Sequence, residues 1–486
     1  MPPLDDTHDC AWREEALKLR AKLEEMEQLK IQIATLQKYV FGKRSEKMPP
    51  VAAELRRTGA AKADPAAAQK KRDANAEKKK ALPTREVAHK VAAAKKHCAH
   101  CKSHDFKPLG PGKDSVIYEY IVAQLERQLH RQETLACPCG KTIVTADGPP
   151  RVGDQGVYGP GFIAHLVVAK CADAIPLNRV ATQLHRIGVP MARSTLVDLF
   201  QRAGSLLAPL AKQILERIAT GDIVLADETT QRVQAAGKTR RAYLWTFLSG
   251  FYVGFRFSAS RSGQTPSDVL GSSKGTLVVD AYSGYNDVTT PEGRTRAGCL
   301  AHARRGLFDA LPTSPIAQQA LDLILDVYRV EHDARQAGLT GTPEHLEMRR
   351  TRSTVHMEAL HVWLVAQQPL HLPQGPLAKA IGYVLNNWVA LTRFLADARI
   401  PPDNNRSEAA LRIAAQGRKT FLFVGNDAAG ENLAVLYTLV KSAEAHGLNP
   451  EVYLADVLLR VSTHPNAKLD ELLPHLWQPT PPAQAA

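Results

Sequence analysis

Apolar residues near the N-terminus recur at intervals of three and four positions. Between Trp12 and Val40 the intervals run 4, 3, 4, 3, 3, 4, 3, 4, which places these side chains on one face of a helix. No other strongly apolar segment lies nearby in the sequence, so the stripe needs a partner helix. We predict a coiled coil that joins two copies of the chain. Packing of this helix against the chain's own body is the alternative.

The segment after this helix is strongly basic. Residues 48–97 are rich in Ala, Lys and Pro and poor in large apolar side chains, which predicts a flexible linker. Between Gly42 and Lys102 there are 17 Lys or Arg and 6 Asp or Glu, a net +11 out of +13 for all 486 residues. A basic arm on a nearly neutral body indicates a polyanionic partner, with nucleic acid favoured over an anionic membrane surface.

The remaining composition points to a cytoplasmic protein of several domains. No apolar stretch approaches the roughly 18 residues that cross a bilayer, and the acidic start of the sequence has no apolar core of a signal peptide. The chain has seven cysteines, an odd number that argues against a disulfide framework. Four of them form two close pairs, Cys98 with Cys101 and Cys137 with Cys139.

Two such pairs, separated by a strand-rich segment, are typical of a zinc-ribbon-like module. Four thiolates can close a tetrahedron around one structural Zn²⁺. The second pair is one residue shorter than the usual spacing, so His100 and His104 are alternative ligands. Buried cysteines without metal are the other interpretation. Beyond this module, helices are predicted over 161–171, 177–187 and 194–210, and the turn at Gly188 gives the last two a helix-turn-helix pattern. By itself this pattern is weak, because most such helix pairs bind no DNA.

Two apolar runs further along each end in an aspartate. Residues 222–227 predict a buried central strand with Asp227 at its tip, and residues 275–280 repeat the device with Asp280. Between them lie a predicted hairpin, 241–257 with its turn at Ser249-Gly250, and a short helix at 267–270. This order is the ribonuclease-H-like plan, in which the first and fourth strands are neighbours. The two carboxylates would then meet, whereas an isolated Asp at a strand end often only caps a helix.

Adjacent carboxylates at a sheet edge suit hard divalent cations such as Mg²⁺. Two such ions about 4 Å apart can activate the attacking oxygen and stabilise the leaving one in phosphodiester chemistry. A third carboxylate is expected from a later helix, and Glu408 is the candidate, with Asn404 or Asn405 as the helix cap and Arg412 one turn further on. A helical insertion over 313–400 would separate Asp280 from Glu408.

Taken in order, these motifs resemble the insertion-sequence-sixty-six family of bacterial DDE transposases. The resemblance runs from Phe41-Gly-Lys-Arg-Ser-Glu-Lys47 through Asp280-Ala-Tyr-Ser-Gly-Tyr285 to the Tyr453–Leu458 tail. Its most specific part is Asp403-Asn-Asn through Glu408, followed by Gly417-Arg-Lys-Thr-Phe-Leu-Phe423. Ala409 departs from the pattern, because many relatives have Arg there.

The resemblance implies a catalytic triad of Asp227, Asp280 and Glu408 that holds two Mg²⁺ (or Mn²⁺) ions, with Glu228 as a less favoured ligand. It also implies hydrolysis at the terminal inverted repeats and strand transfer into target DNA. Five residues are expected to contact DNA. Arg412, Arg418 and Lys419 follow Glu408, and His302 and Arg305 precede the insertion. The expected partners are double-stranded DNA, a second copy of the chain through the coiled coil, and companion transposition proteins. No membrane partner is expected.

The predicted fold is therefore multidomain α+β, with a ribonuclease-H-like α/β catalytic core interrupted by a helical insertion. A coiled coil, a zinc-ribbon-like module and a helical region precede this core. The expected segments are 1–47 (coiled coil), 48–97 (linker), 98–150 (zinc module), 151–215 (helix-turn-helix-like DNA-binding region), 216–312 (core, first part), 313–400 (insertion), 401–445 (core, second part) and 446–486 (C-terminal element). A DNA-binding regulator or inactive remnant is the main alternative function, and a nuclease without strand transfer is the third.

Overall fold

The computed structural model describes residues 156–480 without a break, together with 125–136, 143–145, 148–153 and scattered helical positions between 15 and 33 and between 66 and 77. The chain divides into two units, residues 52–126 and the remainder. Within the described residues, no helix is both long and apolar enough to cross a membrane.

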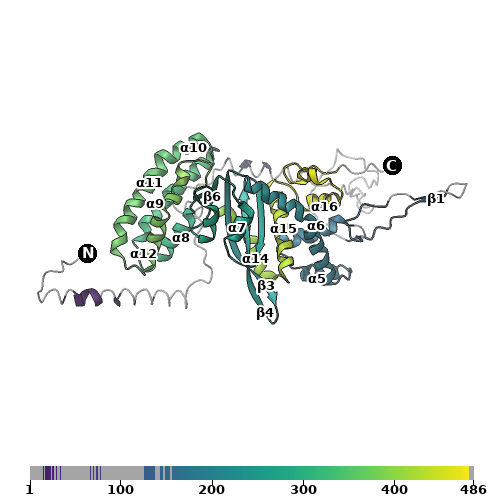
Figure 1. Ribbon diagram of the computed structural model, residues 1–486, viewed down its shortest axis with the longest axis horizontal. Helices are drawn as coiled ribbons and strands as arrows, with labels where there is room; N and C mark the ends of the chain where they lie inside the picture. Colours follow the sequence, from purple (N-terminus) through teal and green to yellow (C-terminus); the bar gives the residue numbers. More distant parts are fainter. Residues whose placement is uncertain are drawn as a thin grey trace, which may run out of the picture. The chain divides into compact units, whose positions relative to one another are not determined.

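A five-stranded mixed sheet forms the centre of residues 156–480 (Figure 1). Its strands stand in the order β5-β4-β3-β6-β7, and they are β3 (Ile223–Ala235), β4 (Lys238–Ser249), β5 (Tyr252–Ser258), β6 (Thr276–Val278) and β7 (Thr295–Ala297). β3, β4 and β5 are antiparallel, whereas β3, β6 and β7 are parallel. The predicted hairpin is confirmed, and so is the prediction that the two strands that lead to Asp227 and Asp280 are neighbours.

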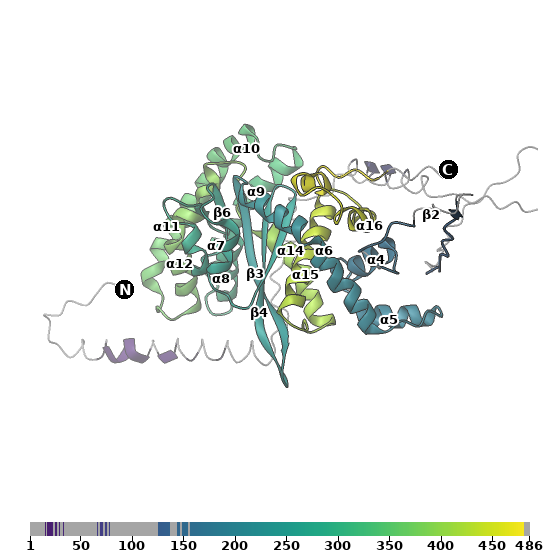
Figure 2. The ribbon, with the colours of Figure 1, turned by 45° about the vertical axis from the view of Figure 1, so that its right-hand side comes forward.

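Strand β3 is much longer than the sequence analysis predicted. Asp227 is not at its tip, because the strand continues for eight more residues to Ala235 and pairs with β4 along this whole length. The apolar run stops at Ala226, but alternating buried and exposed residues such as Val233 and Gln234 continue the strand. The result is a two-stranded arm that runs past the helices (Figures 1 and 2).

Helices from both halves of the chain pack against this sheet. They are α4 (Pro160–Cys171), α5 (Leu177–Arg186), α6 (Arg193–Ala219), α7 (Gln264–Leu270), α14 (Asn405–Thr420), α15 (Asp427–Ala445) and α16 (Pro450–Arg460). α6 extends nine residues beyond the predicted end because Ile214 and Ile218 still face the core. α15 covers the outer edge of β5, where Thr438 and Ser442 hydroxyls accept hydrogen bonds from strand N–H groups at 2.9 and 3.1 Å. This edge is thereby closed to strand pairing.

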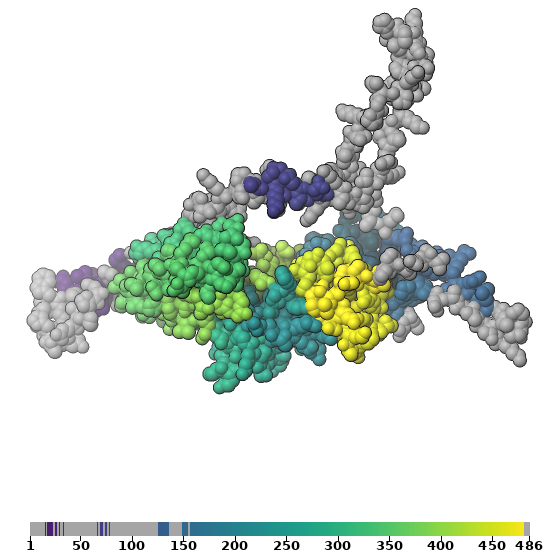
Figure 3. Space-filling model, turned by 90° about the horizontal axis from the view of Figure 1, so that it is seen from above, coloured from purple at the N-terminus to yellow at the C-terminus, as the bar shows by residue number. Residues whose placement is uncertain are grey.

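Residues 300–395 form a helical lobe beside the sheet, green in Figure 3, which also shows the C-terminal helices in yellow. Its α-helices are α8 (Leu300–Ala310), α9 (Ala317–Gln336), α10 (Pro343–Met348), α11 (Thr354–Gln367), α12 (Pro376–Asn386) and α13 (Trp388–Leu391). A buried ion pair joins α9 to the residue after α10: Arg349 donates to both Glu331 oxygens at 2.7 and 2.8 Å. Arg349 Nη1 also donates to the carbonyls of Phe394, Asp397 and Ile400, which fixes the segment that leads into α14.

The N-terminal stripe is described only at scattered positions. All described residues between 15 and 33 are helical, and Leu19, Met26, Leu29 and Ile33 are about half exposed. Helix formation there agrees with the expectation, and an exposed apolar stripe is what a partner helix would cover. The coiled coil itself stays a prediction.

Candidate active site

Three carboxylates that the sequence analysis selected come together at one end of β6. Leu225 of β3 and Val278 of β6 are register partners, and Asp227 and Asp280 each lie two residues further along the chain. Glu408 is in the first turn of α14, which packs against β3. The negative charges of Glu408 and Asp280 both act on Asp227, so the sheet and α14 gather all three groups in one place.

Asp227 is the most perturbed member of this group. Burial raises the pKa of its carboxyl to about 8, and the negative charges of Glu228, Glu408 and Asp280 add to the rise. A hydrogen bond from the Glu228 N–H to Asp227 Oδ1, at 2.9 Å, opposes it. At neutral pH Asp227 is therefore mainly protonated.

Glu408 reaches toward α8 of the helical lobe. Its Oε1 lies 3.9 Å from His302 Nδ1, and its Oε2 lies 3.8 Å from Arg305 Nη2. Both distances are beyond the range of a hydrogen bond. Glu408 Oε1 and His302 Nδ1 are both buried and have no hydrogen-bond partner among the described residues. Two unpaired polar atoms that face each other indicate a place for a water molecule or a ligand. His302 and Arg305, predicted to contact DNA, thus lie beside a predicted catalytic residue.

The start of α14 is fixed by Asn404, which is buried. Its side-chain Nδ2 donates to the carbonyl of Ala226, the residue before Asp227, at 3.0 Å, and its backbone N–H donates to the buried thiol of Cys299 at 3.3 Å. Asn404 occupies the cap position, but its side chain does not bond to the first turn of the helix backbone. The capping role expected for Asn404 or Asn405 is therefore replaced by a direct link between α14 and β3.

Glu228 points away from the other three carboxylates because successive side chains alternate across a strand. Its side chain is 4% exposed. Arg261 Nε donates to one of its oxygens at 2.8 Å, and the Tyr285 hydroxyl donates to the other at 2.7 Å. Arg261 also stacks on the ring of Tyr282. Glu228 is thus engaged in holding the sheet to the segment that follows β6, which agrees with its lower rank as a ligand.

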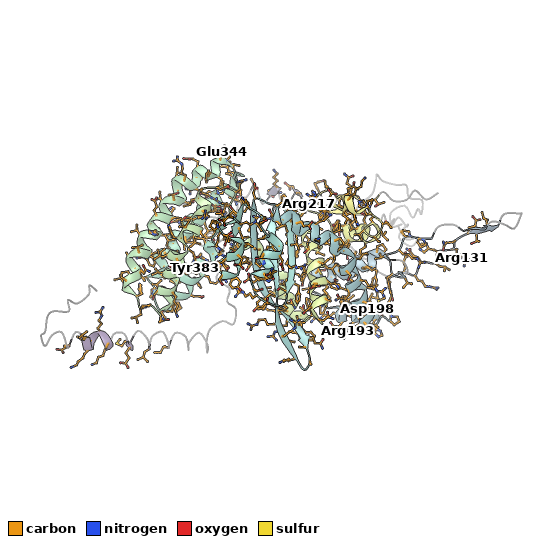
Figure 4. All side chains as sticks on the ribbon, in the orientation of Figure 1. Arg131, Arg193, Asp198, Arg217, Glu344 and Tyr383 are labelled. Atoms are coloured by element: carbon orange, nitrogen blue, oxygen red, sulfur yellow. The ribbon has the colours of Figure 1, made fainter. Side chains whose placement is uncertain are left out.

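Asp280 has neighbours that sequence reasoning missed. Its Oδ1 accepts a hydrogen bond from the Tyr282 N–H at 3.0 Å. Its charge acts on Arg296 of β7 and on Tyr383 of α12, which Figure 4 labels on the helical lobe. Burial, with the Asp280 charge second, raises the pKa of Tyr383 to about 12. Tyr383 lies more than 100 positions from Asp280 along the chain, so no local pattern could have linked the two residues.

The three residues of α14 that were predicted to contact DNA differ in their surroundings. Arg412 and Lys419 are exposed and remain predicted phosphate contacts. Arg418 is half-buried, and its Nη1 donates to the Thr229 hydroxyl at 2.8 Å and to the Thr230 hydroxyl at 2.7 Å. Arg418 therefore braces β3 just beyond Asp227, and burial lowers the pKa of its guanidinium.

Carboxylate oxygens are suitable ligands for a divalent cation, but these side chains are not arranged around one. Within the residues that the structure describes, no three His, Cys, Asp or Glu side chains are arranged to hold a metal ion. Asp227 and Asp280 are each turned toward a neighbouring N–H, and Glu408 toward His302 and Arg305. Hard carboxylate oxygens and the unpaired Glu408 Oε1 nevertheless fit Mg²⁺, and a bound cation would offset the repulsion that raises the Asp227 pKa.

The predicted zinc ligands lie outside the described residues. All four cysteines of the two pairs and the alternative ligands His100 and His104 are in this group. β1 (Thr134–Ala136) and β2 (Ile143–Thr145) pair antiparallel on either side of the segment that holds the second cysteine pair. The structural zinc stays a prediction.

Comparison with known proteins gives the class to which this arrangement belongs. Residues 155–432, which include all three carboxylates, match the model of the transposase IS66 family, and residues 438–475 match the IS66 C-terminal element. The chain therefore belongs to the IS66 family of transposases.

Relatives of this chain occur in Sinorhizobium fredii (strain NBRC 101917 / NGR234). The uncharacterized protein y4jD is 33% identical over 370 residues, which cover 72% of each chain. The uncharacterized protein y4hP is 27% identical over 377 residues, 71% of this chain and 67% of the relative. The uncharacterized protein y4qI is 31% identical over 359 residues, 69% and 66% respectively.

Proposed function

We propose that this protein is a DNA transposase that cuts and joins phosphodiester bonds at the ends of a bacterial insertion sequence, with Mg²⁺ as cofactor. The observation that carries the proposal is the convergence of Asp227, Asp280 and Glu408 within a chain of a transposase family. The strand order β5-β4-β3-β6-β7, with β3 and β6 parallel, supports a ribonuclease-H-like core.

Asp227, Asp280 and Glu408 would hold the divalent cations. When bound, such ions activate the attacking oxygen and stabilise the leaving oxygen of an in-line displacement. Asp227 would bind the cation after losing the proton that burial and the neighbouring carboxylates favour. Arg305, which is exposed beside Glu408, binds a non-bridging phosphate oxygen, and the unpaired His302 Nδ1 binds water or phosphate next to it. Asn404 and Arg418 act as positioning residues, because they hold α14 and β3 in register.

The proposed reaction has two displacements at the same site. In the first, water attacks a phosphodiester at the element's end, and the freed 3′-OH is the leaving group. In the second, this 3′-OH attacks a phosphodiester of target DNA, which joins the two DNAs and releases a new 3′-OH in the target. No covalent bond between protein and DNA is needed, because no side chain acts as the nucleophile.

Cleavage of a labelled duplex that carries the element's own end tests the proposal. Wild type, Asp280→Asn and Asp268→Asn are compared with Mg²⁺; Asp268 is an exposed residue of α7 and serves as the matched control. We expect nicked and joined products with wild type and the control, and none with Asp280→Asn. Binding without cleavage in all three proteins would favour the regulator. Cleavage without joined products would favour a nuclease.

A further inference from the structure

The β3–β4 hairpin extends into a basic arm, defined here as residues 231–241. From Thr229 to Ser267 the chain contains no Asp or Glu and six Lys or Arg. Four of these cations are in the arm: Arg232, Lys238, Arg240 and Arg241. The arm runs beyond the helices that cover the rest of β3 (Figure 2), so this charge is presented to solvent.

Two of the arginines stand directly opposite each other. Arg232 of β3 and Arg241 of β4 are register partners, and both are exposed. Side chains at paired positions lie on the same face of the ribbon, where like charges repel and destabilise the pairing. Neither arginine nor Lys238 forms an ion pair with any carboxylate in the described part of the chain, whereas Arg240 pairs with Asp427. Two guanidinium groups placed in this way can bind one anion between them.

The arm is held in a fixed position. Arg232 accepts a hydrogen bond at its carbonyl from the Val424 N–H at 2.9 Å, and the Gln234 N–H donates to the Val424 carbonyl at 2.8 Å. These bonds fasten the arm to the segment after α14, and the Arg240–Asp427 ion pair fastens it to α15. Both attachments involve chain that follows Glu408. The arm therefore keeps a defined distance from the carboxylates.

That distance follows from the position of Arg232 on β3. Arg232 is five residues beyond Asp227 on the same strand, which corresponds to about 17 Å at about 3.3 Å per residue. Because this separation is odd and β3 pairs with β4 without a bulge, the side chains of Arg232 and Asp227 point to opposite faces of the strand. Arg232 is also close enough to Arg418 to lower the pKa of that guanidinium, so positive charge continues from the arm onto α14.

We propose that the basic arm binds the phosphate backbone of duplex DNA, with Arg232 and Arg241 holding a phosphate between them. Arginine suits this role because its planar group donates two hydrogen bonds to a phosphate. The contact is independent of base sequence, so it positions the duplex and does not select it. The inference rests on the proposed function, since it assumes that DNA is the substrate.

The test measures binding of the full-length protein to a duplex of the element's end over about 50 to 200 mM salt. The variant Arg232→Gln/Arg241→Gln is compared with Lys212→Gln/Lys274→Gln, which removes the same charge from exposed positions on α6 and before β6. Each lost phosphate contact lowers the slope of log K against log salt by about 0.9. We expect the magnitude of this slope to be smaller by about one to two for the arm variant, and the control variant to have the wild-type slope. Lys238→Gln alone should lower the slope by no more than about one.

Further measurements separate the two proposals. Removal of the repelling pair should leave the thermal midpoint at or above that of wild type, and a lower midpoint would overturn the assignment of an unneutralised pair. If wild type binds and cuts the DNA and the arm variant binds with the same slope, the inference fails and the proposed function stands. If wild type does not bind the DNA, or binds duplex RNA or polyglutamate more tightly, both fail.

Discussion

Replacement of Asp227 by Asn should stabilise the protein, and more so as the pH rises. The pKa of this carboxyl is raised from 3.8 to about 8 by burial and by three neighbouring carboxylates. The folded state therefore keeps a proton that the unfolded chain loses, so stability falls as the pH rises from about 4 to about 8 and levels off above that. Asn carries no charge and can still accept the hydrogen bond from the Glu228 N–H.

The magnitude follows from the pKa change. Each tenfold change in proton affinity corresponds to about 1.4 kcal/mol, so the penalty at Asp227 is on the order of 2 kcal/mol at pH 5 and on the order of 5 kcal/mol at pH 8. The gain from Asp227→Asn should thus grow by roughly 3 kcal/mol between these pH values. In a core of this size this corresponds to a widening of the gap in Tm by roughly 5 °C.

The assay is thermal unfolding at pH 5 and pH 8 in EDTA, with Asp268→Asn as the control for loss of one exposed carboxylate. Addition of Mg²⁺ at pH 8 should then raise the Tm of wild type and leave that of Asp227→Asn nearly unchanged, because a ligand stabilises only the state that binds it. The reasoning would be refuted if the Tm difference between Asp227→Asn and wild type did not change with pH. It would also be refuted if the variant were less stable than wild type at pH 8, because the Asp227 charge would then not be destabilising.

Three further outcomes follow from particular contacts. Asn404→Ala removes the bond that joins α14 to the carbonyl of Ala226, and we expect DNA cleavage to fall at least about tenfold while DNA affinity, measured in the same samples, stays unchanged. Glu331→Gln leaves the buried Arg349 without its counter-charge and should cost about 3 kcal/mol in a urea titration. Leu29→Lys places a charge in the N-terminal stripe, and light scattering should show a smaller assembly than wild type; an unchanged mass would exclude the coiled coil as the joint.

The part of the site built from regular strands could be predicted from the sequence. Apolar runs before Asp227 and Asp280 identified β3 and β6, and their adjacency followed from the order of elements between them. The full length of β3 could not be predicted in the same way. The arm alternates buried and polar residues over only a few positions, and its pairing depends on β4 and on Val424, which the periodicity of one segment does not reveal.

The neighbours of the carboxylates were also beyond prediction. Tyr383 of the helical lobe lies near enough to feel the charge of Asp280. Arg261 and Tyr285, from two other segments, donate hydrogen bonds to Glu228. Such contacts depend on which helix packs on which strand, and side-chain patterns constrain this only weakly. Asn404 shows the same limit: its position at a helix start was predictable, but its bond across to β3 is a tertiary contact.

The central claim is that the carboxylates hold a divalent cation during DNA cleavage, and a change of ligand tests it most directly. Asp280→Cys replaces a hard oxygen by a soft sulfur, which binds Mg²⁺ poorly and Mn²⁺ better. We predict that this variant does not cut the element's end with Mg²⁺ and regains part of its activity with Mn²⁺, whereas Asp268→Cys cuts with both. A folded Asp280→Cys protein that is fully active with Mg²⁺, or inactive with both metals, would contradict the account.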